Sequence, residues 1–222
     1  MALPPTNDFL TDSTAEWRQK MVQRQIVARG VQDPAVVAAL EKVPRHCFVP
    51  PSLQDYAYAD QPLTIGYGQT ISQPYIVAYM TEAAQLTPSS KVLEIGTGCG
   101  YQTAILAEIA QAVFTIEIVP ELAQQARDRL EKLGYQNIHY KIGDGYQGWS
   151  EFAPYDAILV TAAPDYRPQP LLQQLAVGGH LVIPVGTFNQ RLEVLHKTST
   201  DLEMEKAIAV RFVPLQGHSY GF

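Results

Sequence analysis

Three glycines within residues 92–101 could bring a small ligand against the backbone. Gly96, Gly98 and Gly100 lie in the run Val-Leu-Glu-Ile-Gly-Thr-Gly-Cys-Gly-Tyr, between an apolar segment and a segment with a helical pattern. Glycine permits a tight turn and a close approach of the ligand. A dinucleotide-binding loop has its third glycine one residue later, where this chain has the bulky Tyr101. The loop alone is a weak signal, because a plain strand-to-helix turn also uses glycine.

Three acidic residues make the signal specific. Glu94 precedes the first glycine by two residues and suits the cationic amino-acid end of a ligand, while Glu117 and Asp144 follow the next two predicted strands. A carboxylate can accept hydrogen bonds from ribose hydroxyls, as expected of Glu117, or from an adenine amino group, as expected of Asp144. Each acid alone could be a solvated loop residue or a helix cap. Together they predict an S-adenosylmethionine site, whose cofactor-binding residues are Glu94, Gly96, Thr97, Gly98, Gly100, Glu117, Ile118, Gly143, Asp144 and Gly145.

The elements that would position these residues alternate between strand and helix from Lys91 onward. The pattern predicts strands at 92–95, 113–117, 139–142, 156–161 and 180–185, with helices at 101–111, 120–133 and 168–175. Two more strands, at 191–197 and 203–212, have no helix between them and should form an antiparallel hairpin at the sheet edge. This is a doubly wound α/β fold with a mostly parallel, Rossmann-like sheet of seven strands. Ligands bind beyond the carboxyl ends of such strands.

The first ninety residues predict a helical cap on this core. Residues 14–29 have helical spacing and end at Gly30, and Asp33-Pro34 is a cap signal for a second helix that ends near Lys42. Residues 44–73 are irregular, and a third helix is expected over 74–86. Residues 1–13 should be loose. We therefore expect one methyltransferase domain over 1–222, with the cap and an active-site loop in 1–90 and the core in 91–222.

Composition narrows the classes of partner. The 222 residues are 46% hydrophobic and 17% charged, with a formal net charge of −6, which does not favour a nucleic-acid partner. The N-terminus lacks the apolar stretch of a signal peptide, and no run reaches the ~18 apolar residues of a membrane helix. Cys47 and Cys99 form no Cys-x-x-Cys motif. We expect a cytoplasmic monomer without membrane or metal.

Several segments carry a resemblance to a known family. They are residues 43–50 (Val-Pro-Arg-His-Cys-Phe-Val-Pro), 57–60, 65–74, 161–164, 177–186 and 211–215. With the glycine loop, they make the chain similar to the protein-L-isoaspartate (D-aspartate) O-methyltransferase family over nearly its whole length. The glycine loop is shared by many methyltransferases, whereas the segment Gly-Gln-Thr-Ile-Ser-Gln-Pro, residues 68–74, is far more specific to this family.

The resemblance implies a class I S-adenosylmethionine-dependent fold and specific roles for residues of the chain. Ser72 would be the active-site residue, although it could also cap the helix that begins near Pro74. The family pattern puts Gln69, Thr70 and Ile71 against cofactor or substrate, and gives Thr70, Ser72, Val213 and Leu215 to the substrate. Cys99 departs from the serine expected there and could add a reactive thiol. The implied substrates are peptides and proteins with isoaspartyl residues, and the implied cofactor product is S-adenosylhomocysteine.

The implied reaction needs no general base. A free carboxyl group has a pKa of about 3.3–4.3, so the accepting carboxylate is already ionised at neutral pH. The five histidines (His46, His139, His180, His196 and His218) show no pairing motif. Alignment and exclusion of water should therefore carry catalysis, with Ser72 orienting the carboxylate. The alternatives are a class I methyltransferase with a different small-molecule acceptor, a non-catalytic binding module and a nicotinamide enzyme.

Overall fold

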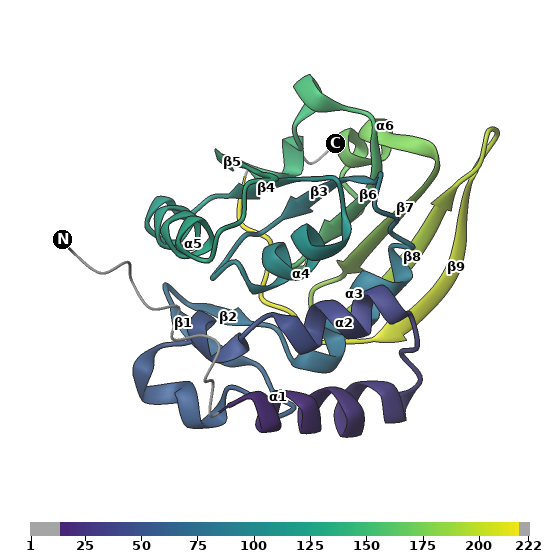
Figure 1. Ribbon diagram of the computed structural model, residues 1–222. Helices are drawn as coiled ribbons and strands as arrows, with labels where there is room; N and C mark the ends of the chain where they lie inside the picture. Colours follow the sequence, from purple (N-terminus) through teal and green to yellow (C-terminus); the bar gives the residue numbers. More distant parts are fainter. Residues whose placement is uncertain (1–13, 218–222) are drawn as a thin grey trace.

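The computed structural model describes residues 14–217, and its centre is a sheet of seven strands in the order β5-β4-β3-β6-β7-β8-β9 (Figure 1). Five are parallel: β3 (Lys91–Ile95), β4 (Ala112–Glu117), β5 (Ile138–Ile142), β6 (Tyr155–Val160) and β7 (Leu175–Val185). The hairpin of β8 (Arg191–Lys197) and β9 (Leu202–Ala209) continues the sheet in antiparallel pairing. The predicted doubly wound α/β fold with an antiparallel edge hairpin is confirmed.

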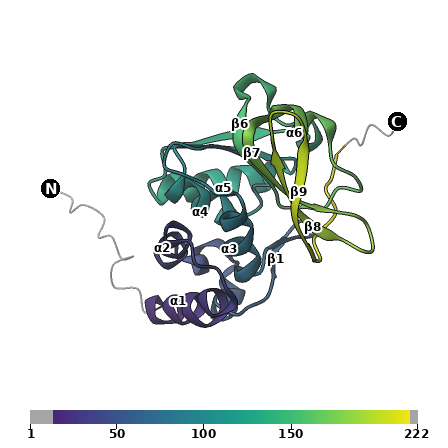
Figure 2. The same ribbon diagram turned by 90° about the vertical axis from the view of Figure 1, so that its right-hand side faces the viewer.

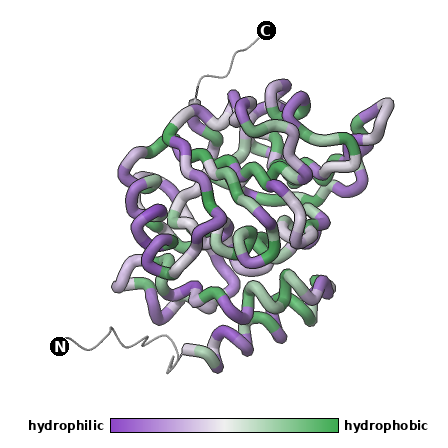
Figure 3. The backbone as a smooth tube through the Cα atoms, turned by 45° about the horizontal axis from the view of Figure 1, so that its top comes forward, coloured by the Kyte–Doolittle hydropathy of each residue, from purple (hydrophilic) through white to green (hydrophobic). Residues whose placement is uncertain are grey.

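Helices cover both faces of the sheet. The crossovers α4 (Tyr101–Ile109) and α5 (Pro120–Lys132) lie on one face, and the short α6 (Gln169–Gln174) lies on the other (Figures 1 and 2). Alternate residues of β3 point to opposite faces, so Val92 and Leu93 belong to two separate apolar clusters. Figure 3 shows that hydrophobic segments concentrate in the centre of the molecule, while hydrophilic segments follow its outer turns. Burial on both faces explains the nearly continuous apolar runs of these strands.

The N-terminal cap packs on the face that carries α4. Its first helix is α1 (Ala15–Met21), which continues through a π turn (Val22–Ile26) and a 3-10 turn (Val27–Arg29) and ends at Gly30 with a φ of 98°. Helix α2 (Pro34–Lys42) begins as predicted, because the Asp33 side chain accepts from the N–H groups of the first turn. Helix α3 (Pro74–Ala83) ends three residues before the predicted end. The expectation for residues 1–13 falls outside the described part of the chain.

The segment expected to be irregular, 44–73, contains regular structure. It holds two 3-10 turns (Arg45–Phe48 and Pro51–Tyr56) and a small hairpin of β1 (Leu63–Gly66) and β2 (Gln69–Ile71). The strands have four and three residues, too few for an alternating pattern to be recognised in the sequence. Tyr67 occupies the turn with a φ of 53°. The hairpin matters because it places residues 69–72 opposite the glycine loop.

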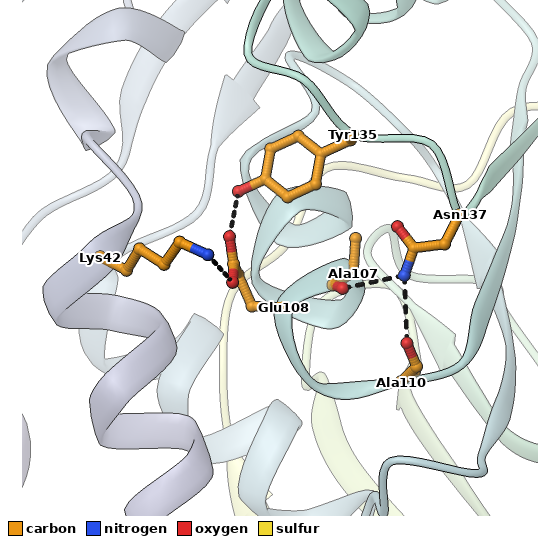
Figure 4. Close-up of polar contacts among 6 residues, drawn as sticks. All are labelled: Lys42, Ala107, Glu108, Ala110, Tyr135 and Asn137. Carbon is orange, nitrogen blue, oxygen red and sulfur yellow. Dashed lines mark hydrogen bonds and ion pairs between the residues drawn. The ribbon is translucent and has the colours of Figure 1, made fainter. Parts of the chain in front are cut away.

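A polar cluster joins the cap to the core (Figure 4). Lys42 at the end of α2 forms an ion pair of 2.6 Å with Glu108 of α4, and the Tyr135 hydroxyl donates to the other oxygen of Glu108 at 2.9 Å. The Asn137 amide donates to the carbonyls of Ala107 and Ala110, which satisfies acceptors at the carboxyl end of α4. Helix α4 is therefore held from the cap on one side and from the loop before β5 on the other.

The environment of Glu94 differs from the one expected from the sequence. Its side chain is completely buried between β3, β4 and α4, and its Oε2 atom accepts hydrogen bonds of 2.6 Å from the hydroxyls of Thr103 and Thr115. Its Oε1 atom has no partner among the described residues. Burial raises the pKa of Glu94 to about 8, against the opposing effect of the two hydroxyls. Glu94 lines none of the described cavities, because the strand directs its side chain into the core.

We expect Glu94→Gln to flatten the dependence of stability on pH. The folded-state pKa of Glu94 lies above its ordinary value of 4.5, so its contribution to the free energy of unfolding is present below about 4.5 and lost as the pH rises to about 8. The wild type should lose up to about 1.4 kcal/mol per pH unit in this window relative to the variant. Urea unfolding at several pH values measures the difference. Glu121→Gln, at an exposed acid of α5, is the control, and parallel curves for wild type and Glu94→Gln would contradict the assignment.

Candidate active site

The glycine loop connects β3 to α4 and lies at the carboxyl ends of β3 and β4. Gly96 and Gly100 have φ angles of 98° and 90°, which residues with a side chain rarely adopt. A Cβ atom on Gly96 would overlap the hydroxyl of Thr161, and one on Gly100 would lie 2.9 Å from Leu130. Both positions therefore need glycine for packing as well as for the turn. Gly98 lines a cavity, and a Cβ atom on it would lie 3.5 Å from the side chain of Ile65 on the hairpin.

This first cavity lies between the glycine loop and the β1–β2 hairpin. Its lining combines the loop, the specific segment 69–72 and the strand ends: Gln69, Thr70, Ile71, Ser72, Val77, Gly96, Thr97, Gly98, Cys99, Tyr101, Gln102, Glu117, Thr161 and Val213. Residues about 145 positions apart in the chain thus meet in one place, as the sequence predicted for Gln69, Thr70, Ile71, Ser72, Gly96, Thr97, Gly98 and Glu117. Gly100 lies behind the cavity, against α5.

Glu117 is the acid that the structure presents to the cavity. Its side chain ends β4 and is nearly buried, with an exposed fraction of 6%. Its Oε2 atom accepts from the N–H of Gly98 at 2.8 Å, and its Oε1 atom accepts from the N–H groups of Ile118 and Val119. A carboxylate has about four acceptor positions, so capacity remains for a ligand hydroxyl. Glu117 therefore shapes the glycine loop and faces the cavity at the same time.

A neighbouring cavity extends from Glu117 along the ends of β3, β4 and β5. Its lining consists of Gln69, Ile95, Gly96, Ile116, Glu117, Ile118, Gly143, Gly145, Leu215 and Gln216. Asp144 is not part of this lining, and its Oδ1 atom accepts from the N–H of Tyr146 at 2.9 Å. The helix-cap alternative considered for Asp144 is thus the contact that the structure shows. The predicted residues Ile118, Gly143 and Gly145 do lie on the cavity wall.

A further groove opens on the other side of Ser72. It is lined by Pro62, Thr70, Ser72, Gln73, Ile76, Thr161 and residues 209–213. Thr70, Ser72, Thr161 and Val213 line both this groove and the first cavity. The two spaces therefore meet at these four residues, and any reaction between their occupants would take place there.

The chain after β9 differs from the prediction. Strand β9 ends at Ala209 rather than 212, because the chain crosses to Ala163, whose N–H donates to the carbonyl of Val213 and whose carbonyl accepts from the N–H of Leu215, both at 2.8 Å. The resemblance assigns Val213 and Leu215 to the substrate; the carbonyl of Val213 and the N–H of Leu215 are paired within the chain. Val213 still lines the groove, whereas Leu215 lines the neighbouring cavity.

Ser72 is held by a residue that sequence reasoning missed. The buried guanidinium of Arg45 donates to the carbonyl of Ser72 at 2.7 Å and to that of Ala57 at 2.8 Å, and it lies 4.8 Å from the ring centre of Tyr101. Gln73, not Ser72, occupies the cap position of α3, and no side chain caps that helix. The Ser72 hydroxyl is therefore not used as a cap. The feature of the sequence that could have drawn attention to Arg45 is its charge inside the largely apolar segment 43–50.

Cys99 is not the reactive thiol that the sequence suggested. It is buried, and burial raises the pKa of its thiol. Cys47 and Cys99 are both free, and no histidine lines any of the three cavities described above. The residues that line these spaces thus include hydroxyl and amide side chains, one carboxylate (Glu117) and one arginine (Arg211), a set suited to binding and alignment.

Comparison with known proteins agrees with this geometry. The family model described as protein-L-isoaspartate(D-aspartate) O-methyltransferase matches residues 16–220. A protein-L-isoaspartate O-methyltransferase of Picosynechococcus sp. is 87% identical over the full length of both chains, and one of Gloeobacter violaceus is 58% identical over 88% of this chain and 96% of its own.

Solved structures give the same fold. One described as a protein-L-isoaspartate O-methyltransferase is 30% identical with a TM-score of 0.82, covering 90% of this chain and 66% of that chain. A putative enzyme of that name from Plasmodium falciparum, in complex with S-adenosyl-L-homocysteine, is 24% identical with a TM-score of 0.78 over 90% of this chain and 98% of its own. The described residues include no helix long and apolar enough to cross a membrane. With the family model matching almost the entire chain, this protein is an enzyme of the protein-L-isoaspartate(D-aspartate) O-methyltransferase family.

Proposed function

We propose that this chain transfers the methyl group of S-adenosylmethionine to the free α-carboxylate of L-isoaspartyl residues, and to the free side-chain carboxylate of D-aspartyl residues, in damaged proteins. The observation that carries the proposal is the junction of two spaces at Thr70, Ser72, Thr161 and Val213. One space has the glycine loop and Glu117, and the other is an open groove along residues 209–213. Cap and core both contribute to the junction, so we treat residues 1–222 as one functional domain in a cytoplasmic monomer.

The residues at the first two cavities fit the cofactor. Glu117 would accept from the ribose hydroxyls, and the loop of Gly96, Thr97 and Gly98 leaves room for close approach at its backbone. Ile118, Gly143 and Gly145 would contact the adenine, with Asp144 beside them, and Gln69 and Ile71 would close the site from the hairpin. S-adenosylmethionine, when bound, supplies an electrophilic methyl group. Glu94 supports this loop from behind, because its partner Thr115 is itself hydrogen-bonded to the Thr97 hydroxyl at 2.6 Å.

The chain's own residues would contribute alignment. The acceptor carboxylate is ionised at neutral pH, so the reaction needs no general base. This agrees with the lining of these cavities, which contains no histidine. Ser72 would donate its hydroxyl proton to one carboxylate oxygen and direct the other towards the methyl group, with Thr70 beside it. Arg45 would hold the backbone of Ser72 in place through its hydrogen bond to the Ser72 carbonyl. The walls of the groove would displace water, which strengthens each of these polar contacts.

We expect Glu117→Ala to weaken the binding of S-adenosylhomocysteine by about 10- to 150-fold. This corresponds to about 1.5–3 kcal/mol for hydrogen bonds to a charged group. Titration calorimetry measures the change. The control is Glu121→Ala, at an exposed acid four residues further on that lines none of the described cavities. Equal affinity in wild type and Glu117→Ala would show that the carboxylate does not hold the ribose.

Ser72→Ala should lower kcat/KM for an isoaspartyl peptide by about 10- to 100-fold, because one hydrogen bond to the carboxylate is lost. The affinity for S-adenosylhomocysteine should stay near that of the wild type, since the Ser72 carbonyl that Arg45 holds is unchanged. Steady-state kinetics and calorimetry separate the two effects, with the exposed Ser150→Ala as control. Wild-type turnover in Ser72→Ala would remove Ser72 from the catalytic residues.

The strongest functional prediction is selectivity between two isomeric peptides. An isoaspartyl link leaves a free α-carboxylate, whereas a normal aspartyl residue holds its carboxylate one carbon further from the backbone. A misplacement of about 1 Å can cost ~100-fold when catalysis depends on alignment. We therefore expect strong methylation of an isoaspartyl peptide and at least about 100-fold less of its L-aspartyl twin.

The measurement is radiolabelled methyl transfer to both peptides at equal concentration, with a chelator present because no step calls for a metal. An isoaspartyl peptide with its α-carboxyl amidated is the matched control and should not be labelled. Equal labelling of the two isomers, or labelling only of a small-molecule acceptor, would contradict the proposed substrate while leaving a methyltransferase.

A further inference from the structure

Two histidines and a glutamate meet on the edge hairpin, away from the cavities described above. His180 belongs to β7, His196 lies directly opposite it on β8, and Glu205 belongs to β9. His180 pairs with Ala157 of β6, which pairs with Val92 of β3. The cluster therefore lies further from the carboxyl edge of the sheet than the glycine loop does, because Val92 precedes the last residue of β3 by three positions. None of the three lines a described cavity, and the proposed reaction uses none of them.

A β-bulge brings the glutamate to the histidines. Val194 and Leu195 of β8 pair with Lys206 and Met204 of β9, so Glu205 between them has no opposite residue. An extra residue of this kind changes the direction in which its side chain points. The Oε1 atom of Glu205 consequently lies 3.7 Å from Nε2 of His180 and 4.0 Å from Nδ1 of His196.

The spacing of the three groups suits a transition-metal ion. One ligand atom from each of the three residues lies within 4.8 Å of the others. Ligand atoms around a tetrahedral zinc ion lie roughly 3.3 Å apart, given zinc–ligand distances of about 2.0–2.1 Å. Closing the set thus shortens the separations between ligand atoms by at most about 1.5 Å. The two rings are stacked, with planes 14° apart, so their in-plane lone pairs do not point at a common ion. One ring must therefore rotate about its Cβ–Cγ bond, and His196 is the partly exposed one.

The acidic residues around the cluster also favour a cation. Glu205 adds a negative charge, and Glu203, opposite His196, adds a second one on the same strand. Two imidazoles and one carboxylate form a common zinc ligand set, in which water takes the fourth position.

We propose that His180, His196 and Glu205 form a zinc site that joins β7, β8 and β9. The ion links three neighbouring strands and stabilises the folded edge hairpin by mass action. Strand β9 leads directly into residues 209–213, so the site secures one wall of the groove proposed for the substrate. The proposal is independent of the proposed methyl transfer, because no step of that reaction passes through the ion.

The test is calorimetric titration of the metal-free wild-type chain with zinc chloride. We expect one ion per chain, and a loss of affinity of about 100-fold or more in His196→Ala and in Glu205→Gln, since even outer-shell partners of a metal contribute 10–100-fold. The matched control is His139→Gln, at an exposed histidine on the opposite edge strand β5, which should bind zinc like the wild type. Glu205 is exposed, so Glu205→Gln should fold even where a histidine variant does not.

Two spectroscopic measurements complete the test. Cobalt(II) in place of zinc should give the visible bands of a four-coordinate nitrogen and oxygen site, and zinc should raise the melting temperature of wild type but not of Glu205→Gln. The proposal is overturned by absence of saturable binding, by unchanged affinity in both cluster variants, by loss of binding in His139→Gln, or by a thiolate–cobalt band that assigns the ion to a cysteine.

Discussion

The active-site region depends on one buried cation. Arg45 has no exposed surface, yet its guanidinium donates to the carbonyls of Ala57 and Ser72 and lies over the ring of Tyr101. One guanidinium therefore contacts three parts of the chain: the cap, the segment that carries Ser72, and Tyr101, the first residue of α4. A buried charge is costly unless its surroundings compensate it, and here two carbonyl dipoles and an aromatic face offset part of that cost, while the Nη1 atom has no partner among the described residues. Such an arrangement holds only when all three segments are in place, which couples the position of Ser72 to the docking of the cap.

The acids around the glycine loop have different tasks because they lie at different depths. Glu94 points into the core and connects, through Thr115, to the hydroxyl of Thr97. Glu117, one strand away and at the strand end, reaches the cavity and holds the N–H of Gly98. Burial raises the pKa of Glu94, so near neutral pH it is largely a neutral hydrogen-bonding group, whereas Glu117 lines the first cavity. Two residues of the same chemical type thus divide the support of the loop from the lining of the cavity.

The edge hairpin gives the enzyme its second surface. After β9 the chain crosses the carboxyl end of the sheet and pairs with Ala163, which places Val213 at the junction of cavity and groove. The Gln190 amide donates to the carbonyl of Phe212 at 3.1 Å and accepts from its N–H. The groove is therefore built largely from the C-terminal part of the chain and the first cavity from the glycine loop in its middle, with residues 69–72 between them.

The sequence alone determined the order of the seven strands of the central sheet, the helices between them and the glycine loop. Those features follow from local periodicity, glycine spacing and cap signals such as Asp33-Pro34, all of which act over a few residues. The resemblance added Ser72 and its neighbours, which the structure places at the junction of the two spaces. Tertiary structure alone decided which way each side chain pointed. Whether Glu94 faces ligand or core depends on the partners Thr103 and Thr115, and the pairing of Val213 and Leu215 depends on Ala163, fifty residues earlier. Arg45 and the cluster of His180, His196 and Glu205 likewise involve residues far apart in the chain, where no local pattern reports on burial or on the neighbours that a fold supplies.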